Sequence, residues 1–308
     1  MESFCEKGGE YILKSALKNL RTSQPFNRLA TAGAKSLFPK PPEFFIKHLH
    51  RIDLVESRLP NGSTLKLKSK GDDWVSNQVF WRGWRGYEPE TIPLFYKLAE
   101  KSAVTFDVGS YVGFFTLLAA HANNNAKVYA FEPMKAIYER LLQNIELNDL
   151  KNVKTTLGAV GSEEGEAEFF HVEGFELPTS SSLSSEFVKD NENITSTTVK
   201  IFQLDKFAVE NGIEALNLIK IDTETTEPDV LIGAKGLLTK HQPEIFCEVL
   251  AGRAEGQKLK EILREFGYNF YLLTPEGPVK KDEIIGHPEY LNYLFTHLNP
   301  TDLSQYYQ

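Results

Sequence analysis

The feature that most limits the fold of this chain is an ordered run of short apolar segments and a glycine turn over residues 103–134. AVTFDVG (103–109) is an apolar segment that ends at a glycine, and residues 113–121 continue with the composition of a buried helix. KVYAFEP (127–133) is a second apolar segment, and Pro133 ends it. Strand, turn, helix and strand in this order are typical of a parallel βαβ unit.

The same alternation continues towards the end of the chain. Helices are expected over residues 135–148, 227–240 and 256–266, and strands over 152–160, 216–223, 243–250, 269–273 and 292–297. A strand-rich insertion with EAEFFHV (166–172) and TTVKIFQL (197–204) lies between the strands expected at 152–160 and 216–223. Strands that alternate with helices favour an α/β fold, in which helices cover both faces of a mostly parallel sheet.

The first hundred residues lack this alternation. Apolar residues recur at helical spacing between positions 12 and 20, and FPKPPEF (38–44) contains three prolines that end any helix. TLKLK (64–68) has the pattern of an edge strand with lysines towards solvent. We therefore expect residues 1–100 to form an N-terminal helical and strand-containing extension or lid, and residues 101–308 to form the main ligand-binding domain.

Charge and cysteine content exclude several classes of protein. The 308 residues include 34 Lys and Arg against 42 Asp and Glu, a formal net charge of −8, which argues against nucleic acid or an anionic membrane as partner. Two distant cysteines, Cys5 and Cys247, do not suit a disulfide framework or a zinc site. No apolar run approaches the ~20 residues of a membrane span, and residues 1–20 do not resemble a secretory signal. We expect a cytoplasmic protein, and the oligomeric state stays open.

The glycine turn FDVGSYVGFFT (106–116) indicates a ligand site. Gly109 and Gly113 let the backbone approach a ligand and let the helix pack on the strand. Their Gly-x-x-x-Gly spacing differs from the Gly-x-Gly-x-x-Gly of dinucleotide-binding proteins, and no Gly-Lys-Ser/Thr phosphate loop occurs. The ligand is therefore expected to lack a diphosphate, which disfavours a dehydrogenase.

Two acidic residues end neighbouring expected strands. Glu132, 25 residues after Asp107, can accept hydrogen bonds from both hydroxyls of a ribose. Asp107 can accept from an ammonium group, directly or through water. Together they suggest a nucleoside with a positively charged amino-acid tail, as in S-adenosylmethionine. The alternative is that both acids only cap helices.

Several segments also occur in an order known from one protein family. They are WRGYEPET (84–91), DVGSYVGFFT (107–116), AFEP (130–133), YERLLQNIELN (138–148), AVG (159–161), SSL (181–183) and LIKIDTETTEPDVLIGA (218–234). Together they resemble the FkbM family of S-adenosylmethionine-dependent methyltransferases, over roughly residues 80–250.

The resemblance implies a Rossmann-like class I methyltransferase fold with a mostly parallel seven-stranded sheet and one antiparallel strand near the end. It implies transfer of a methyl group to a hydroxyl of a small acceptor, a sugar or a secondary metabolite. On this basis we assign S-adenosylmethionine binding to Asp107, Gly109, Ser110, Tyr111, Gly113, Glu132, Pro133, Ala159, Ser181 and Asp222.

LNLIKIDT (216–223) leads into the expected catalytic residues. Alternation along an extended segment places Lys220, Asp222 and Glu224 on one side. Such charges are costly to bury unpaired, so they must pair, bind a ligand or reach solvent. Our hypothesis is that one carboxylate orients or deprotonates the acceptor hydroxyl, while Lys220 tunes it or contacts the substrate.

Glu248, at the end of the next expected strand, leaves two alternatives. It could join Asp222 and Glu224 in a carboxylate cluster that holds a divalent cation, because hard cations prefer oxygen ligands. It could instead pair with Lys220.

One position departs from the pattern of the family. The family usually has Asp-Val-Glu-Gly-x-Glu where this chain has Asp-Thr-Glu-Thr-Thr-Glu over residues 222–227. Thr225 stands in place of the glycine, and a β-branched residue disfavours positive φ. Either the turn is altered or the glycine is not conformationally essential. The rival hypotheses are an inactive or divergent S-adenosylmethionine-binding protein and a methyltransferase that acts on a macromolecule.

Overall fold

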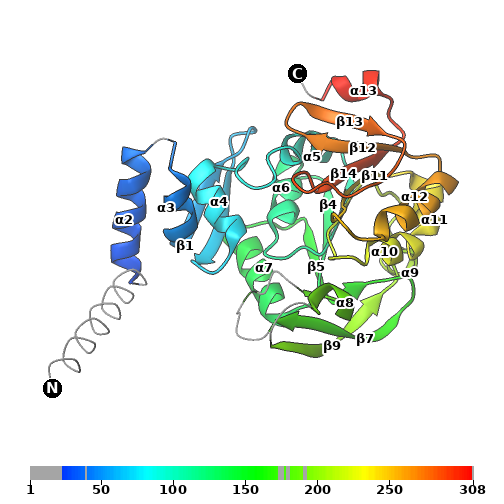
Figure 1. Cartoon of the computed structure of the whole chain (residues 1–308), viewed down its shortest axis with the longest axis horizontal. Coiled ribbons are helices and arrows are strands. Elements are labelled where there is room, and N and C mark those ends of the chain that lie inside the picture. The colour runs from blue at the N-terminus through cyan, green and yellow to red at the C-terminus, as the bar shows by residue number, and fades with distance from the viewer. Residues whose placement is uncertain (1–22, 39, 173–176, 178–180, 190–192, 307–308) are drawn as a thin grey trace. The chain divides into compact units, whose positions relative to one another are not determined.

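The computed structural model in Figure 1 describes residues 23–38, 40–172, 177, 181–189 and 193–306. The helix expected between positions 12 and 20 lies outside these residues. Contacts divide the chain into two units, Met1–Tyr87 and Glu88–Gln308, which are described separately.

The first unit contains a hairpin and three described helices. Its elements are α2 (Gln24–Leu37), α3 (Glu43–His48), β1 (Ile52–Arg58), β2 (Thr64–Lys70) and α4 (Trp74–Arg82). The strands pair antiparallel. Leu65 and Leu67 of β2 are buried, and Lys66 and Lys68, which follow them, are more exposed, which confirms the expected strand with its period of two. The indole Nε1 of Trp81 donates to the carbonyl of Leu49 (3.1 Å) within the same unit.

The second unit begins at Glu88, whereas the sequence analysis placed residues up to 100 in the N-terminal extension. Helix α5 (Ile92–Ala99) lies in this interval. The ring of Phe95 packs edge-on against Phe115 and Phe246 of the second unit. Buried aromatic contacts of this kind explain why α5 groups with the sheet.

An eight-stranded sheet forms the centre of the second unit, in the order β13-β12-β14-β11-β10-β3-β4-β5. Its strands are β3 (Val104–Val108), β4 (Lys127–Glu132), β5 (Val153–Leu157), β10 (Leu218–Ile221), β11 (Glu244–Glu248), β12 (Asn269–Thr274), β13 (Gly277–Lys281) and β14 (Asn292–Thr296). The five strands from β5 to β11 are parallel, and β14 runs antiparallel between β11 and β12. This confirms the mostly parallel class I methyltransferase architecture and the expected antiparallel strand near the end of the chain. The eighth strand is β13, which extends the sheet by a tight hairpin with β12.

Helices cover both faces of this sheet (Figure 1). Their bounds are α6 (Phe114–Ala122), α7 (Lys135–Leu147), α9 (Leu204–Glu210), α10 (Glu227–Ile232), α11 (Lys235–His241), α12 (Glu255–Glu265) and α13 (Pro300–Ser304). The single helix expected over 227–240 is two helices, interrupted at Gly233 and Ala234. A Cβ at Gly233 would stand 2.2 Å from the carbonyl of Gly161, so this close approach requires glycine.

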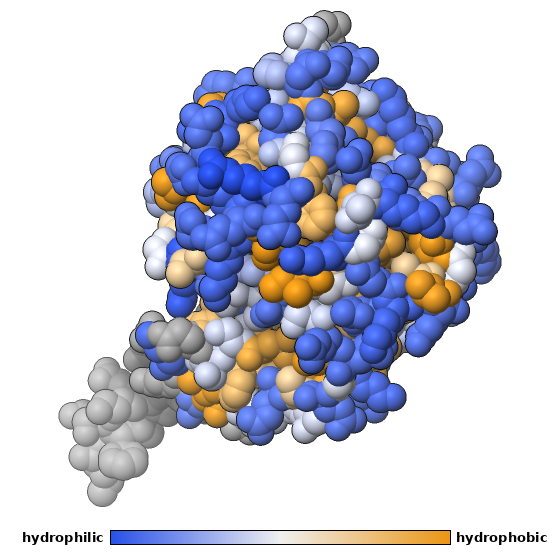
Figure 2. Space-filling model, turned by 90° about the vertical axis from the view of Figure 1, so that its right-hand side faces the viewer, coloured by the Kyte–Doolittle hydropathy of each residue, from blue (hydrophilic) through white to orange (hydrophobic). Residues whose placement is uncertain are grey.

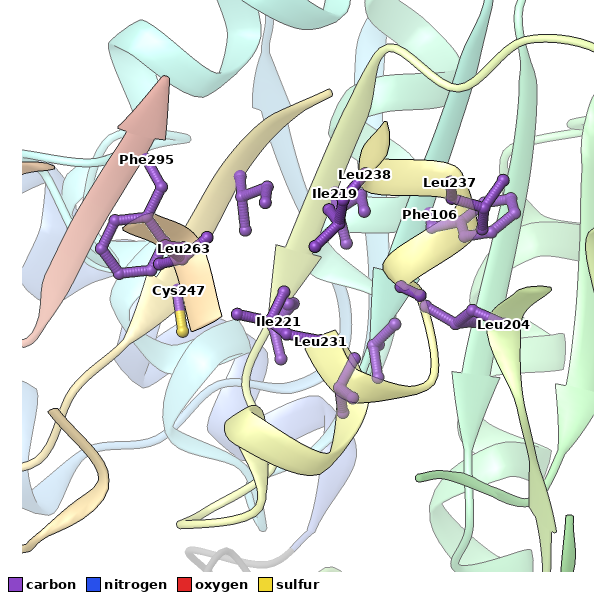
Figure 3. Packing of buried hydrophobic residues seen from close by; sticks show 14 of the residues in the cluster. Phe106, Leu204, Ile219, Ile221, Leu231, Leu237, Leu238, Cys247, Leu263 and Phe295 are labelled. Atoms are coloured by element: carbon purple, nitrogen blue, oxygen red, sulfur yellow. The ribbon is translucent and has the colours of Figure 1, made fainter. Parts of the chain in front are cut away.

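Alternate residues of the strands build the core on one face. Phe106, Ile219 and Ile221 point towards the leucines of α9, α10 and α11 in Figure 3, and all are buried. Full burial of such a side chain contributes about 1.5–3 kcal/mol. The intervening residues, Asp107 and Lys220, therefore face the opposite side of the sheet, where α5 and α6 pack.

The insertion forms a second sheet of four strands in the order β6-β9-β7-β8. Its strands are β6 (Ala159–Val160), β7 (Gly165–Val172), β8 (Ser181–Ser182) and β9 (Ile194–Phe202), with α8 (Ser185–Val188) after β8. The strand expected over 152–160 is therefore two strands, β5 and β6, which belong to different sheets and meet at Gly158. A Cβ at Gly158 would stand 2.5 Å from the Phe202 ring, so only glycine fits there.

The order of the strands places a topological switch point between β3 and β10. From β3 the chain builds β4 and β5 on one side of the sheet, and then crosses to β10 and β11 on the other. Ligands of open α/β sheets bind outside the carboxyl ends of the strands at such a point. Asp107 and Asp222 stand at the ends of the two strands that border it.

Among the described residues, no helix combines the length and the apolar composition that crossing a bilayer requires. The face of the molecule in Figure 2 is mostly hydrophilic, with apolar residues in scattered groups.

The loops after β3 and β10 touch at Gly109, which generates a first prediction. Gly109 has φ +79°, and an added Cβ would stand 1.8 Å from the carbonyl oxygen of Asp222. Gly109→Ala should therefore lower the free energy of unfolding by about 3 kcal/mol, measured by urea denaturation. Gly165→Ala is the matched control, because nothing lies within 4 Å of its added Cβ. Equal stability of the two variants would contradict this account of the contact.

Candidate functional site

The loop after β3 is anchored to the end of β4 by its backbone. The N–H groups of Gly109 and Ser110 both donate to the carbonyl of Phe131 (3.1 and 3.0 Å). The Ser110 hydroxyl donates to the carbonyl of Asp107 (2.7 Å), so it stabilises the turn from within. Gly113 has φ +89° and caps α6, in keeping with the expected glycine turn.

Glu132 holds the same loop from the end of β4. Its side chain is almost fully buried and accepts hydrogen bonds from the backbone N–H of Tyr111 (3.0 Å) and of Met134 (2.8 Å). Burial raises the pKa of Glu132 to about 8, although these two hydrogen bonds act in the opposite direction. When Glu132 is ionised, each carboxylate oxygen accepts one backbone hydrogen bond and keeps a second lone pair, so acceptor capacity remains for ligand hydroxyls.

Asp107 is buried at the end of β3 and faces α6. Its carboxylate accepts a hydrogen bond from the Thr116 hydroxyl, a residue that the sequence analysis did not select. Burial raises the pKa of Asp107 to about 6, while Thr116 and the charge of Lys220 oppose this shift. The sequence feature that could have indicated this contact is Thr116 itself, a small polar residue in a mostly apolar helix.

Lys220 is the buried positive charge among the residues that the sequence analysis named for catalysis. It lies opposite Asp107 in the β10–β3 register and is 1% exposed. Its Nζ donates to Asp222 Oδ2 (3.2 Å) and stands 5.0 Å from the centre of the Phe115 ring. Burial acts to lower the pKa of Lys220, but the carboxylates of Asp222, Glu88 and Glu248 outweigh it and hold the pKa above its ordinary value. Lys220 therefore stays charged.

A second partner of Lys220 comes from the far end of the chain. Nζ also donates to Oδ1 of Asn292, the first residue of β14 (3.2 Å), and the Nδ2 of Asn292 donates to Glu88 (2.9 Å). Because Glu88 can only accept when ionised, it orients the amide so that its oxygen faces the lysine. The sequence analysis missed Asn292, and no local pattern marks it.

The loop after β10 has an unusual backbone. Glu224 and Thr225 have φ of +57° and +86°. Thr225 thus adopts the left-handed conformation at the position where the family usually has glycine. A β-branched residue therefore carries positive φ at this position of the loop.

Two side chains hold this loop from either side. Oε1 of Glu227 accepts from the backbone N–H of Thr223 (3.0 Å) and of Thr225 (3.2 Å). The hydroxyl of Ser182, from β8 of the inserted sheet, donates to the carbonyl of Glu224 (2.6 Å). Neither Glu227 nor Ser182 was among the predicted site residues, although both lie in segments that resemble the family.

The carboxylates of Asp222, Glu224 and Glu248 come together beside Lys220. Each offers an oxygen, and these oxygens lie within 4.8 Å of one another. Burial, and then the neighbouring carboxylates, raise the pKa of Glu224 and of Glu248 above the ordinary range. The structure thus brings together the residues that the sequence analysis named for catalysis and for a metal.

The other predicted cofactor residues lie at the edges of this region. Pro133 separates Glu132 from Met134, and Tyr111 lies within the glycine turn with φ +49°. Ser181 pairs with His171 in the inserted sheet, and Ala159 is buried against Phe169 and Val199. Their roles in cofactor binding stay predictions.

The order and direction of the strands are those of the Rossmann-like class I methyltransferase fold. The sequence model described as the Methyltransferase FkbM domain matches residues 107–270, more than half of the chain. This chain belongs to the FkbM methyltransferase family.

Two curated relatives and one solved structure show the range of similarity. The 31-O-demethyl-FK506 methyltransferase FkbM of Streptomyces tacrolimicus is 24% identical over 255 residues, which cover 74% of this chain and 93% of that protein. The AMB antimetabolite synthetase AmbE of Pseudomonas aeruginosa is 28% identical over 54% of this chain, but this match spans only 9% of AmbE. The crystal structure of Methyltransferase FkbM from Methylobacillus flagellatus KT is 14% identical with a TM-score of 0.40, covering 64% of this chain and 44% of that chain. A likeness of that size carries no argument about function.

The left-handed conformation of Thr225 predicts that glycine would be more stable there. A non-glycine residue in this region costs about 1–3 kcal/mol, against about 0.5–1 kcal/mol of extra backbone entropy for glycine. Thr225→Gly should therefore raise the free energy of unfolding by about 1 kcal/mol in urea denaturation. Thr225→Ala is the control, because it keeps the Cβ that causes the strain. If alanine stabilises as much as glycine, strain is not the cause.

The raised pKa of Glu132 predicts a pH dependence of stability. In the folded chain Glu132 keeps its proton up to about pH 8, whereas in the unfolded chain it ionises near the ordinary value of 4.5. The folded state holds the extra proton in this window, so stability falls as pH rises from 4.5 towards 8, by at most about 1.4 kcal/mol per pH unit.

The check is the free energy of unfolding of the wild type and of Glu132→Gln between pH 5 and pH 8. The other buried carboxyl groups are common to both proteins, so their effects cancel. The wild type should lose stability more steeply, and parallel profiles would remove Glu132 as the source.

Proposed function

We propose that this chain is an S-adenosylmethionine-dependent O-methyltransferase that acts on a hydroxyl of a small molecule, a sugar or a secondary metabolite. The observation that carries the proposal is the arrangement at the switch point. Asp107 and Glu132 flank the glycine turn on one side, and Lys220, Asp222 and Glu224 stand beside it on the other.

The residues on the cofactor side fit S-adenosylmethionine. Glu132 keeps lone pairs for two ribose hydroxyls, and Asp107 presents a carboxylate for an ammonium group. Gly109 has no side chain to block the approach of a ligand to the turn. When bound, S-adenosylmethionine supplies a methyl group on a positively charged sulfur.

The catalytic residues of the chain orient the acceptor and take up its proton. Glu224 lies with Asp222 in the carboxylate cluster, where its ionised form can accept the hydroxyl proton. Lys220 donates to Asp222 and orients its carboxylate, while Asn292 keeps the lysine in place. A displacement at carbon needs mainly proximity and alignment, and these fixed side chains provide both.

The acceptor class is supported by chemistry and by one relative. The name of the Streptomyces relative describes methyl transfer to an oxygen of a demethylated small molecule. The net charge of −8 does not favour a nucleic acid acceptor. The free, buried thiol of Cys247 is in keeping with a reducing, cytoplasmic compartment.

The second candidate is a cofactor-binding protein without turnover. Its support was the replacement of the glycine by Thr225. Because Thr225 keeps the left-handed conformation and Glu227 still holds the loop, this replacement leaves the backbone of the site in place. The enzyme is therefore the stronger proposal.

Calorimetric titration with S-adenosylmethionine tests the proposal. The wild type should bind in the micromolar range, and Asp107→Ala and Glu132→Ala should each weaken binding at least ten-fold, about 1.4 kcal/mol. Glu224→Gln should leave this affinity within about three-fold and lower turnover once an acceptor is found among hydroxylated sugars and metabolites, and Asp222→Asn should also lower turnover.

Circular dichroism of each variant separates lost binding from lost folding. A folded wild type that does not bind S-adenosylmethionine would refute the proposal. Binding that survives in both Asp107→Ala and Glu132→Ala would show that the cofactor lies elsewhere.

A further inference from the structure

Glu248 has a buried oxygen that nothing in the described part of the chain satisfies. It is the last residue of β11, next to β10 in the sheet. Its Oε2 is inaccessible to solvent and has no hydrogen-bond partner among the described residues. A buried carboxylate oxygen without a donor is costly, and buried polar groups in folded proteins almost always have a partner. This oxygen therefore indicates a missing partner.

The neighbouring basic side chains do not donate a hydrogen bond to Oε2 of Glu248. The hydrogen bonds of Lys220 go to Asp222 and Asn292. Arg253 acts on Glu224 from a distance and stacks on the Phe187 ring, 5.6 Å from its centre. The sequence-based alternative in which Glu248 pairs with Lys220 thus leaves its Oε2 unsatisfied.

The neighbouring carboxylates lie so close together that their ionised forms repel one another unless a positive charge lies between them. Asp222, Glu224 and Glu248 each place an oxygen within 4.8 Å of the others. Two oxygens on opposite sides of an ion stand about 4.2 Å apart around Mg²⁺ and about 4.8 Å apart around Ca²⁺, from bond lengths of about 2.1 and 2.4 Å. The three oxygens therefore already stand at separations that a single ion could bridge.

We propose that Asp222, Glu224 and Glu248 bind one divalent cation, Mg²⁺, Mn²⁺ or Ca²⁺, at the carboxyl ends of β10 and β11. Nζ of Lys220 donates to Oδ2 of Asp222, which leaves Oδ1 of Asp222 available to bind the ion. Carboxylate oxygens are the ligands that these hard cations prefer. The part of the cation in catalysis rests on the proposed function: beside Glu224, it would orient the acceptor hydroxyl and ease loss of its proton.

The test is calorimetric titration of the full chain, freed of metal by a chelator, with MgCl₂, MnCl₂ and CaCl₂ in turn and without S-adenosylmethionine. Bound Mn²⁺ is counted independently by electron paramagnetic resonance. We expect one ion per chain with millimolar or tighter affinity, and at least a ten-fold loss in Glu248→Gln. Asp222→Asn is a second variant with the same expectation.

Glu244→Gln is the matched control. Glu244 lies at the other end of the same strand, and its buried Oε2 also has no partner among the residues that the structure describes, but it is outside the cluster. Its replacement should leave the affinity for the ion unchanged. The proposal is overturned if the folded wild type binds no ion, if Glu248→Gln and Asp222→Asn both bind as the wild type does, or if Glu244→Gln loses binding equally.

Titration with S-adenosylmethionine separates this proposal from the proposed function. Binding of S-adenosylmethionine without any binding of a cation would overturn the cation site and leave the methyltransferase assignment intact. Binding of a cation that Glu248→Gln abolishes, without binding of S-adenosylmethionine, would support the cation site and refute the proposed function.

Discussion

A charged lysine inside the sheet is the constraint on which this site depends. Lys220 is buried in the middle of β10, where an unpaired charge would be very costly. It is therefore paired with Asp222 on its own segment and with Asn292 on β14. These contacts tie the parallel strands to the antiparallel end of the sheet, beside the proposed ligand site.

The loop that follows β10 has a strained backbone. Glu224 and Thr225 adopt left-handed backbone, which persists only where the surroundings hold it. Glu227 stabilises this backbone from within the loop by accepting a hydrogen bond, and Ser182 stabilises it from the inserted sheet by donating one. The inserted sheet therefore stabilises the candidate site, because a residue of its strand β8 binds the carbonyl of a proposed catalytic residue.

Sequence reasoning predicted more of the fold than of the site's supporting contacts. The strands from 103 to 133, the helix after Pro133 and the final antiparallel pair are confirmed, because each has a strong local apolar pattern. The helix over 227–240 and the strand over 152–160 were each predicted as one element and are two. Gly233 and Gly158 mark these breaks, where another segment approaches too closely for a side chain.

The sequence by itself determined the order of strands and helices, the glycine turn and the acidic residues at the ends of the strands, because these depend on local periodicity and residue type. Only the tertiary structure decided which distant groups meet them. Asn292 reaches Lys220 across 72 residues, and Ser182 reaches Glu224 across 42. Side-chain hydrogen bonds of this range leave no periodic trace in the sequence, since they arise from strand order and crossover connections. The buried oxygen of Glu248, which has no hydrogen-bond partner in the described part of the chain, likewise exists only once the sheet has formed.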